Sequence, residues 1–254
     1  MNTLTIRSTV LGEGIPKIIV PIVDKTQKKI LEKAELLSGM EIDIVEWRAD
    51  YFEQIADLSS VTAVLKTMRQ ILGDKVILFT FRTKKEGGEL DIAPEDYLKL
   101  NTCAAESGCP DLVDVEIFSG DDTVRANIEA IHKTGAKVVG SNHDFFKTPS
   151  EEELVGRLLK MQEMGADIPK IAVMANSPQD TLTLLSATYK MYSKYADRPI
   201  LTMSMQNTGS LSRMSGELFG SCATFGSVGQ SSAPGQVSTK ELAQVLQVMH
   251  NAIC

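Results

Sequence analysis

The stretch from Ala136 to Met174, AKVVGSNHDFFKTPSEEELVGRLLKMQEMGADIPKIAVM, contains one complete strand–helix–strand unit. Ala136–Ser141 is a short run of mainly small and β-branched residues, which is typical of a buried strand. A helix start follows at Thr148–Ser150, and Gly165 is the matching stop signal. Ile168–Met174 then predicts a second buried strand. Two strands joined by a helix form the repeating unit of a parallel α/β fold.

The same alternation of short strands and longer helices runs along the whole chain. The strand-like runs are Lys17–Ile22, Ile42–Trp47, Lys75–Arg82, Leu112–Phe118, Ala136–Ser141, Ile168–Met174, Ile200–Met205 and Ser221–Val228. The helical stretches with the clearest start and stop signals are Thr26–Leu37, a stretch from near Pro94 to Gly108, residues 148–165, and Ser238 to about Ala252. Eight such units in 254 residues predict a (β/α)8 TIM barrel that takes up residues 1–254 as a single domain.

The segments on either side of the first predicted strand, Lys17–Ile22, also bear on the fold. Before it, the alternating residues Leu4–Leu11 predict a short N-terminal β-hairpin that closes one mouth of the barrel. The main alternative fold is a doubly wound open sheet, which usually carries a glycine-rich turn after its first strand. Here the sequence after that strand is Val23-Asp24-Lys25-Thr26, and the chain has no Walker A motif. The barrel is therefore favoured.

Composition and charge limit the classes of function. Lys and Arg number 26 against 33 Asp and Glu, and the net charge of −7 argues against binding to nucleic acid or to an anionic membrane. A few local arginines could still bind a small anionic substrate. Met1–Lys17 lacks the apolar core of a signal peptide, and no apolar run approaches the roughly 20 residues of a membrane span. We therefore expect a soluble, cytoplasmic protein.

The cysteines give no sign of a metal site. Cys103, Cys109, Cys222 and Cys254 show no CxxC spacing, and only 3 histidines accompany them. No structural zinc site assembles from this set, and reduced thiols are expected. The sequence therefore predicts no metal.

Charged side chains alternate with bulky apolar ones along several predicted strands. Because side chains alternate faces along a strand, the apolar face should pack under the helices and the charged face should line the barrel interior. The inward charges are then Glu46, Arg48, Arg82, Asp114, Glu116 and Lys170. Each buried ion is costly, and a structural barrel would place Val, Ile and Leu there, so a functional site is favoured. Asp114 and Glu116 could instead only balance neighbouring cations.

Lys170 is the most informative of these residues. It lies between Pro169 and the apolar run Ile171–Met174. On the inward face it would lose hydration, and with Arg48 and Arg82 nearby its pKa would fall, leaving a neutral amine that attacks carbonyl groups to form a Schiff base. The alternative is a lysine at a strand start that reaches solvent. The catalytic interpretation requires the long side chain to extend toward the C-terminal mouth, where barrel active sites lie.

His143 is predicted at the C-terminal end of its strand, in the sequence Ser141–Phe145, a position that suits a general acid or base. His132 and His250 fall on predicted helices, where structural roles are expected.

The last two loops could recognise an anion. Arg213 follows the seventh strand, and Ser231–Gln236 follows the eighth, so hydroxyl, amide, backbone N–H and guanidinium groups could clamp a carboxylate or a phosphate. Met203 and Met205 share the inward face of the seventh strand, where they either belong to the core or form an apolar wall of a pocket.

Several short motifs of this chain occur in an order that is known from one enzyme family. They are Glu46–Arg48, Phe79–Arg82, Lys85–Gly88, Asp114–Ile117, Val138–Asp144, Ile168–Ala172 and Ser232–Gln236. With these motifs the chain resembles, over essentially its full length, the type I 3-dehydroquinate dehydratases, the Schiff-base enzymes of the shikimate pathway. The resemblance implies a (β/α)8 barrel that converts 3-dehydroquinate to 3-dehydroshikimate and water without a metal or other cofactor. It also suggests a homodimer.

The resemblance implies a role for each matching residue. Lys170 corresponds to the imine-forming lysine, His143 to the base that takes the C2 proton and then protonates the leaving C1 hydroxyl, and Glu86 to the carboxylate that orients His143. The residues that would hold the substrate carboxylate are Arg213, Ser232 and Gln236. Those that would contact the ring hydroxyls are Glu46, Arg48 and Arg82. The walls of the pocket would be Phe145, Met203, Met205 and Ala233.

Two other functions remain open on the residues alone. Another Schiff-base barrel, such as an aldolase acting on a phosphorylated sugar, would share Lys170 and need a phosphate site in the last two loops. A degenerate barrel would bind a carboxylic ligand without turnover. The presence of Lys170, His143 and Glu86 together argues against the degenerate barrel.

Overall fold

The computed structural model describes residues 3–229 and 237–253. The strands are β1 (Leu4–Ile6), β2 (Thr9–Leu11), β3 (Lys17–Ile22), β4 (Ile44–Arg48), β5 (Val76–Thr80), β6 (Leu112–Glu116), β7 (Lys137–Asp144), β8 (Ile168–Met174), β9 (Leu201–Met205), β10 (Ala223–Ser227) and β11 (Val237–Ser238). Within the described residues the main sheet is parallel and has nine strands, in the order β11-β10-β3-β4-β5-β6-β7-β8-β9.

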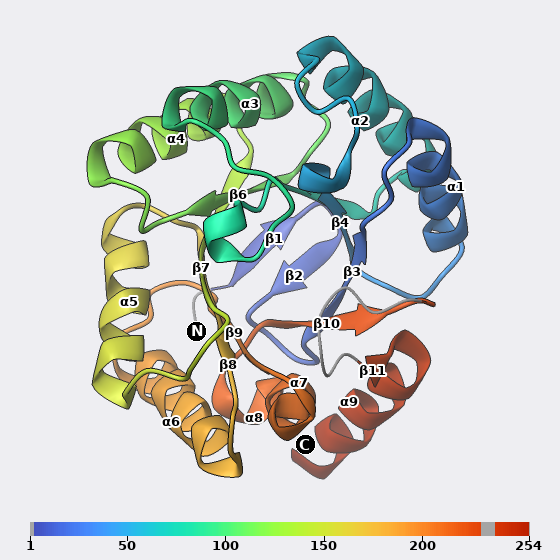
Figure 1. The fold of residues 1–254 in the computed structure, drawn as a ribbon. Helices are drawn as coiled ribbons and strands as arrows, with labels where there is room; N and C mark the ends of the chain where they lie inside the picture. The colour runs from blue at the N-terminus through green and yellow to red at the C-terminus, as the bar shows by residue number, and fades with distance from the viewer. Residues whose placement is uncertain (1–2, 230–236, 254) are drawn as a thin grey trace.

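The sheet curls until β9 meets β10. A parallel bridge joins Ile200 to Ser221, and the Cys222 N–H donates to the Ile200 carbonyl at 2.8 Å. The Thr202 N–H donates to Ser221 Oγ at 3.0 Å across the same seam. Strands β3 to β10 thus form a ring with the helices outside it, which confirms the predicted (β/α)8 barrel (Figure 1).

The helices follow the strands in the expected order. They are α1 (Gln27–Ser38), α2 (Leu58–Leu72), α3 (Pro94–Glu106), α4 (Asp121–Lys133), α5 (Glu151–Glu163), α6 (Pro178–Lys194), α7 (Ser210–Met214), α8 (Gly216–Phe219) and α9 (Thr239–Ile253), with 3-10 turns η1 (Ala49–Tyr51), η2 (Lys84–Glu86) and η3 (Asn207–Gly209). The predicted start signals act as N-caps: Thr26 accepts the Lys29 N–H, and Ser150 accepts the Glu153 N–H.

Six of the eight predicted barrel strands differ from the observed ones at one or both ends, by one to three residues, and the start of β4 and the end of β7 have a visible cause. Strand β4 begins at Ile44 rather than Ile42, because the Asp43 side chain accepts the Ile18 N–H at 2.8 Å and takes the place of a strand partner. Ile42 consequently packs in the layer under the helices, not inside the barrel. Strand β7 runs three residues further than predicted, to Asp144, because it stays paired with β8 as far as Val173.

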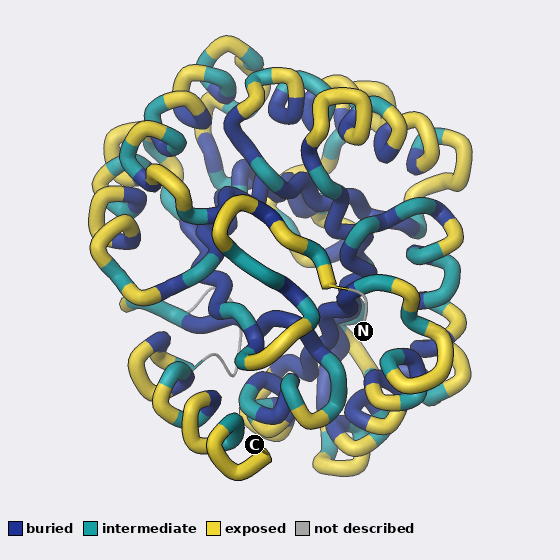
Figure 2. The backbone as a smooth tube through the Cα atoms, turned by 180° about the vertical axis from the view of Figure 1, so that it is seen from behind, coloured by how far each residue is buried: buried dark blue, intermediate teal, exposed yellow. Residues whose placement is uncertain are grey.

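The N-terminal hairpin closes the mouth at the N-terminal ends of the barrel strands, as predicted. Strands β1 and β2 pair antiparallel, and their inward residues Ile6 and Leu11 are buried against the interior side chains of the barrel. Arg7 at the turn donates to Asp111 at 2.6 Å, at the start of β6. Figure 2 shows the hairpin crossing this end of the molecule. A pocket inside the barrel can therefore open only at the opposite mouth.

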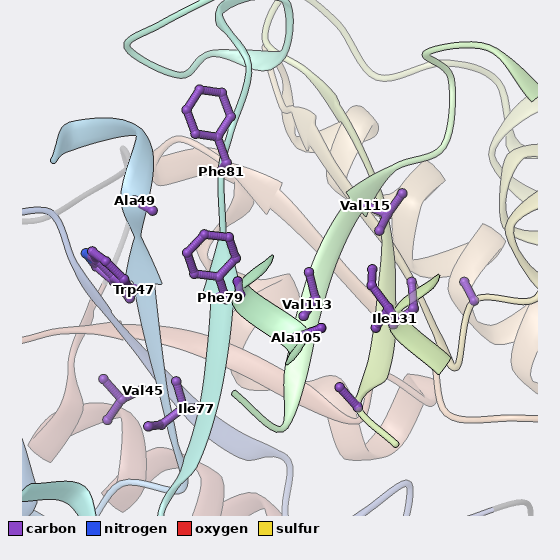
Figure 3. Packing of buried hydrophobic residues seen from close by; sticks show 14 of the residues in the cluster. Val45, Trp47, Ala49, Ile77, Phe79, Phe81, Ala105, Val113, Val115 and Ile131 are labelled. Atoms are coloured by element: carbon purple, nitrogen blue, oxygen red, sulfur yellow. The ribbon is translucent and has the colours of Figure 1, made fainter. Parts of the chain in front are cut away.

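Two hydrophobic layers hold the barrel together. The outer layer lies between sheet and helices, where Trp47 packs edge-to-face on Phe52 with ring centroids 5.7 Å apart. Trp47 packs in the same way on Phe79, at 5.6 Å (Figure 3). The inner layer fills the barrel near its N-terminal end, with Ile44 and Leu78 among its members. Because the bulky residues face outward, the polar residues of the same strands face the interior above the inner layer.

Among the described residues, no helix combines the length and the hydropathy needed to cross a lipid bilayer.

Candidate active site

A pocket of about 100 Å³ lies inside the barrel above the inner hydrophobic layer. Side chains from the strand ends and the loops that follow them line it: Glu46, Arg48, Tyr51, Arg82, Glu86, Gly87, His143, Phe145, Lys170, Ala172, Met203, Met205, Arg213 and Phe225. This is the C-terminal mouth, where barrel enzymes carry their active sites. Five of these residues have acidic or basic side chains that are almost fully buried, which is expensive unless the groups serve a site: Glu46, Arg82, Glu86, Lys170 and Arg213.

Lys170 extends from the third position of β8 into this pocket. Its side chain is 3% exposed, and Nζ lies 3.5 Å from Asp114 Oδ2 and 5.0 Å from the ring centroid of Phe225. Burial lowers the pKa of Lys170, with Asp114 and Glu46 opposing the shift and two arginines adding to it. The lysine is therefore inside the barrel, not at the solvent, and its pKa is lower than that of an exposed lysine.

Arg82, just after β5, is bound by the two acidic residues of β6. Its Nη2 donates to Asp114 Oδ2 at 2.7 Å, and its Nη1 donates to Glu116 Oε1 at 3.0 Å and to Ser141 Oγ at 2.9 Å. Asp114 and Glu116 are not among the described residues that line the pocket. The geometry thus favours the structural alternative for these two carboxylates: they balance Arg82 and, in the case of Asp114, Lys170.

His143 is fixed by Glu86, which comes from η2 across the mouth. Glu86 Oε2 accepts the backbone N–H of His143 at 3.0 Å and lies 2.9 Å from Nδ1. The ring stacks on Phe145 with centroids 6.4 Å apart. Burial and the nearby arginines and lysine hold the pKa of His143 well below its usual value, so the imidazole is neutral. With Nδ1–H donated to Glu86, the lone pair on Nε2 can accept a proton.

Gly87 and Gly88 allow η2 to bring Glu86 this close. Gly87 has φ +84°, and a Cβ there would lie 2.3 Å from the Phe145 ring. A Cβ on Gly88 would lie 1.9 Å from the carbonyl oxygen of Arg82, and a backbone atom has little freedom to give way. The glycine pair in the Lys85–Gly88 motif is therefore required by a tight backbone approach.

We expect Gly88→Ala to displace the η2 turn and to destabilise the protein by about 1–3 kcal/mol, as overpacking of a closely packed site does. The midpoint of chemical denaturation measures the effect. The matched control is Gly39→Ala at the end of α1, where an added Cβ has no neighbour within 4 Å. Equal midpoints for the two variants would contradict the packing argument.

Glu46 and Arg48 reach the pocket from β4. Glu46 accepts a hydrogen bond from Thr80 Oγ1 at 2.9 Å. Arg48 donates two hydrogen bonds to the buried carboxylate of Asp50, both at 2.8 Å, and stacks over the Tyr51 ring at 5.1 Å. The guanidinium is thus held rigidly at the rim of the pocket.

Arg213 lies on α7 and is 1% exposed. Its Nη1 is 3.9 Å from the sulfur of Met203, and Met205 lies two residues further along β9 on the same inward face. Burial lowers the pKa of Arg213 to about 10. An anionic ligand group in the pocket would stabilise the charged form of this guanidinium.

The structure brings most of the predicted site residues together. Lining the one pocket are Lys170, His143, Glu86, Glu46, Arg48, Arg82, Arg213, Phe145, Met203 and Met205. Ser232, Ala233 and Gln236 lie outside the described residues. His132 Nε2 lies 2.7 Å from Asp167 Oδ2, and His250 Nδ1 lies 2.8 Å from Glu217 Oε1; neither histidine lines this pocket.

The sequence interpretation missed four residues around the site. Phe225 lies beneath the Lys170 amine, and its inward position in the eighth strand was a readable signal. Asp50 and Tyr51 hold Arg48, but they lie in the η1 turn, where no periodicity indicates which way a side chain points. Asn142 donates to Glu86 Oε1 at 3.1 Å from a strand position whose parity suggests the opposite face.

Comparisons with known proteins agree with one another. The model of the type I 3-dehydroquinase family matches residues 18–253. The chain is 50% identical over 252 residues to the 3-dehydroquinate dehydratases of Salmonella agona and Salmonella typhimurium, covering 99% of this chain and 100% of each relative.

Solved structures of similar enzymes superpose closely. The type I 3-dehydroquinate dehydratase of Clostridium difficile, determined with covalent modified comenic acid, has a TM-score of 0.97 and 47% identity over 99% of this chain and 100% of that one. The 3-dehydroquinate dehydratase of Geobacillus kaustophilus has a TM-score of 0.95 and 35% identity over 98% of this chain and 97% of its own.

Proposed function

Because the chain belongs to the type I 3-dehydroquinase family and is a hydro-lyase, we propose that it removes water from 3-dehydroquinate through an imine on Lys170, with His143 as base and acid. The observation that carries the proposal is that the buried amine and the Glu86-bound imidazole line the same pocket. The covalent ligand of the Clostridium difficile relative supports covalent chemistry in this family.

Imine formation uses the neutral amine of Lys170. Nζ attacks the C3 ketone carbon, a C–N bond forms, and the ketone oxygen leaves as water to give an iminium ion. Burial lowers the pKa of Lys170, with Arg82 and Arg48 acting in the same direction, and this favours the unprotonated amine that the attack needs. The iminium then withdraws electrons from C2, so that the C2–H bond becomes acidic.

The elimination uses His143. Its Nε2 takes the C2 proton, the electron pair moves toward the iminium nitrogen, and the enamine then expels the C1 hydroxyl as it receives a proton from the imidazolium. Because one imidazole both removes the C2 proton and protonates the C1 hydroxyl, the proton and the water leave from the same face of the substrate ring. Hydrolysis of the iminium returns Lys170 and releases 3-dehydroshikimate, so the net products are 3-dehydroshikimate and one water.

The remaining pocket residues hold and shape the substrate. We assign the carboxylate to Arg213 with Ser232 and Gln236, the last two from the segment outside the described residues. The ring hydroxyls are assigned to Glu46, Arg48 and Arg82, whose side chains reach the pocket. The apolar walls are Phe145, Met203, Met205 and Ala233.

The test of the proposed function is direct. Purified protein is mixed with 3-dehydroquinate, and the conjugated enone of 3-dehydroshikimate is followed by ultraviolet absorbance and identified by mass spectrometry. Stoichiometric product supports the proposal. Absence of product, or turnover of a phosphorylated sugar instead, would contradict it.

We expect Arg213→Ala to raise KM about 10- to 150-fold, corresponding to the roughly 1.5–3 kcal/mol of a charge-assisted hydrogen bond. The change in kcat should be smaller, since Arg213 contacts a group that does not react. Arg198→Ala is the control, because Arg198 pairs with Asp197 outside the pocket. An unchanged KM in a folded Arg213 variant would count against the carboxylate role.

The resemblance also supports a wider assignment. We propose that the enzyme serves the shikimate pathway of aromatic amino acid biosynthesis, in the cytoplasm, as one barrel domain that forms a homodimer. Light scattering tests the last point: a homodimer should have twice the 27.7 kDa of the chain.

A further inference from the structure

Asn142 connects Glu86 to helix α5. Its Nδ2 donates to Glu86 Oε1 at 3.1 Å, and its Oδ1 accepts from Arg157 Nη1 at 2.8 Å. Arg157 is held in turn by Glu153, one turn earlier on the helix, which accepts from Nη2. A continuous set of contacts thus runs from α5 to the carboxylate beside His143, and the mechanism above does not use Arg157.

Arg157 decides which end of the Asn142 amide faces Glu86. A guanidinium carries only N–H donors, so the amide atom toward it has to be the acceptor Oδ1. Nδ2 then points to Glu86 as a donor, and a donated hydrogen bond stabilises the charged form of a carboxyl group. An ionised Glu86 can accept Nδ1–H of His143, which leaves the lone pair on Nε2 facing the substrate.

We propose that Arg157 is a positioning residue for His143: by fixing the Asn142 amide it favours the ionised form of Glu86 and, through Glu86, the Nδ1–H tautomer of His143. The inference rests on the proposed role of His143 as the base. Arg157 does not line the pocket that holds Lys170; it lines a neighbouring cavity that Asn142 and His143 also line. Its hydrogen-bonded connection to the imidazole runs through Asn142 and Glu86.

Other charged groups face Glu86 from three neighbouring strands. Arg82, just after β5, lies 3.6 Å from Oε2 and favours the ionised form. Glu116 and Asp114 on β6 oppose it, His143 faces it from β7, and burial raises the pKa of Glu86 to about 7. The amide hydrogen bond acts in the lowering direction. Loss of that bond is therefore expected to raise the pKa of Glu86 further.

The experiment compares Arg157→Leu with Lys160→Leu. Lys160 is a second cation on α5; it pairs with Asp121 at 2.7 Å, so its loss removes an ion pair from the same helix without touching the amide. Nitrogen-15 NMR of the 3 imidazoles reports the tautomer of each, with the His143 signal assigned by His143→Ala. This readout needs no turnover.

In the unmodified protein and in Lys160→Leu, His143 is expected to be the Nδ1–H tautomer. In Arg157→Leu its population should shift toward Nε2–H. The kcat should fall about tenfold, a part of the ~10²–10⁴-fold that a positioned base contributes, with KM nearly unchanged. The acid limb of the kcat profile should move to higher pH. Arg157→Lys, which retains a donor, should restore part of each effect.

The alternative outcomes are distinct. If the tautomer and the acid limb of Arg157→Leu match those of Lys160→Leu, the inference is wrong, whether or not kcat has fallen. If Arg157→Leu adds its full loss in a Glu86→Gln background, the effect does not pass through Glu86 and the inference is again wrong. Failure of the proposed function gives a separate result: the unmodified protein releases no 3-dehydroshikimate, while the tautomer still depends on Arg157.

Discussion

A Lys170→Ala variant is expected to form no imine and to lose about 10⁴-fold or more in kcat, as enzymes do on loss of a covalent nucleophile. Among the described residues that line the pocket, Lys170 is the one lysine, so no second amine is placed to take over. Without the iminium, the C2 proton lacks the electron sink that makes it acidic. A correctly positioned His143 then has no sufficiently acidic proton to remove.

Trapping by borohydride measures the covalent step itself. Hydride reduces the iminium to a secondary amine. Condensation removes one water and reduction adds two hydrogens, so the intact mass should rise by the mass of the ligand minus one oxygen atom. Peptide mapping should place the adduct on Lys170. Lys137→Ala, which removes a lysine that pairs with Asp167 at 3.6 Å outside the pocket, should leave the adduct unchanged.

The Lys170→Ala variant is expected to fold, and a second variant checks this point. Asp114 keeps its hydrogen bonds from Arg82 at 2.7 Å and from Ser141 at 2.6 Å when Lys170 is removed, so the buried carboxylate stays satisfied. Lys170→Met replaces most of the lost volume and should show the same catalytic defect. Substantial turnover by either folded variant, or an adduct on a different lysine, would rule out the covalent mechanism on Lys170.

The barrel could be predicted because its signals are local and repeated. The alternation of side chains along the strands correctly predicted that Glu46, His143 and Lys170 point into the barrel. A strand has only two faces, and the more apolar face packs against the helices, so the other face points inward. The same argument found Arg82 but not its function in the network. Arg82 pairs with Asp114 and Glu116 because these side chains of β6 lie at the same level along the barrel axis. The alternation within a single strand does not reveal this register between strands.

Side-chain contacts made from the turns could not be predicted from the sequence. Asp50 fixes Arg48 from η1, and Asn142 fixes Glu86 although its parity points it to the helix layer. These contacts depend on the path that a loop takes across the mouth of the barrel. Neither the hydropathy nor the periodicity of the sequence indicates that path. Asp43 shows the same limit at a strand boundary: its carboxylate replaces a backbone partner, which moved the start of β4.

A His143→Ala variant is expected to form the imine normally and to stall at proton removal, with kcat about 10²–10⁴-fold lower, the usual contribution of a general base. Lys170 keeps its own surroundings in this variant, since its nearest charged neighbour is Asp114 at 3.5 Å and not the imidazole. Borohydride should therefore trap an adduct with the mass of the substrate rather than the product. Exchange of the C2 proton with deuterated solvent should be lost as well.

The pH dependence of kcat in the unmodified protein is expected to have the sign that this assignment requires. The pKa of His143 lies well below its usual value, so the base stays neutral as pH falls toward 7. Burial raises the pKa of Glu86 to about 7, so kcat should decline below that pH, because the protonated carboxyl can donate to Nδ1 and favour the wrong tautomer of His143. His132→Ala should keep both the rate and this limb, because His132 pairs with Asp167 at 2.7 Å away from the pocket. If His143→Ala fails to react with the ketone at all, or retains C2 exchange, the base is another residue.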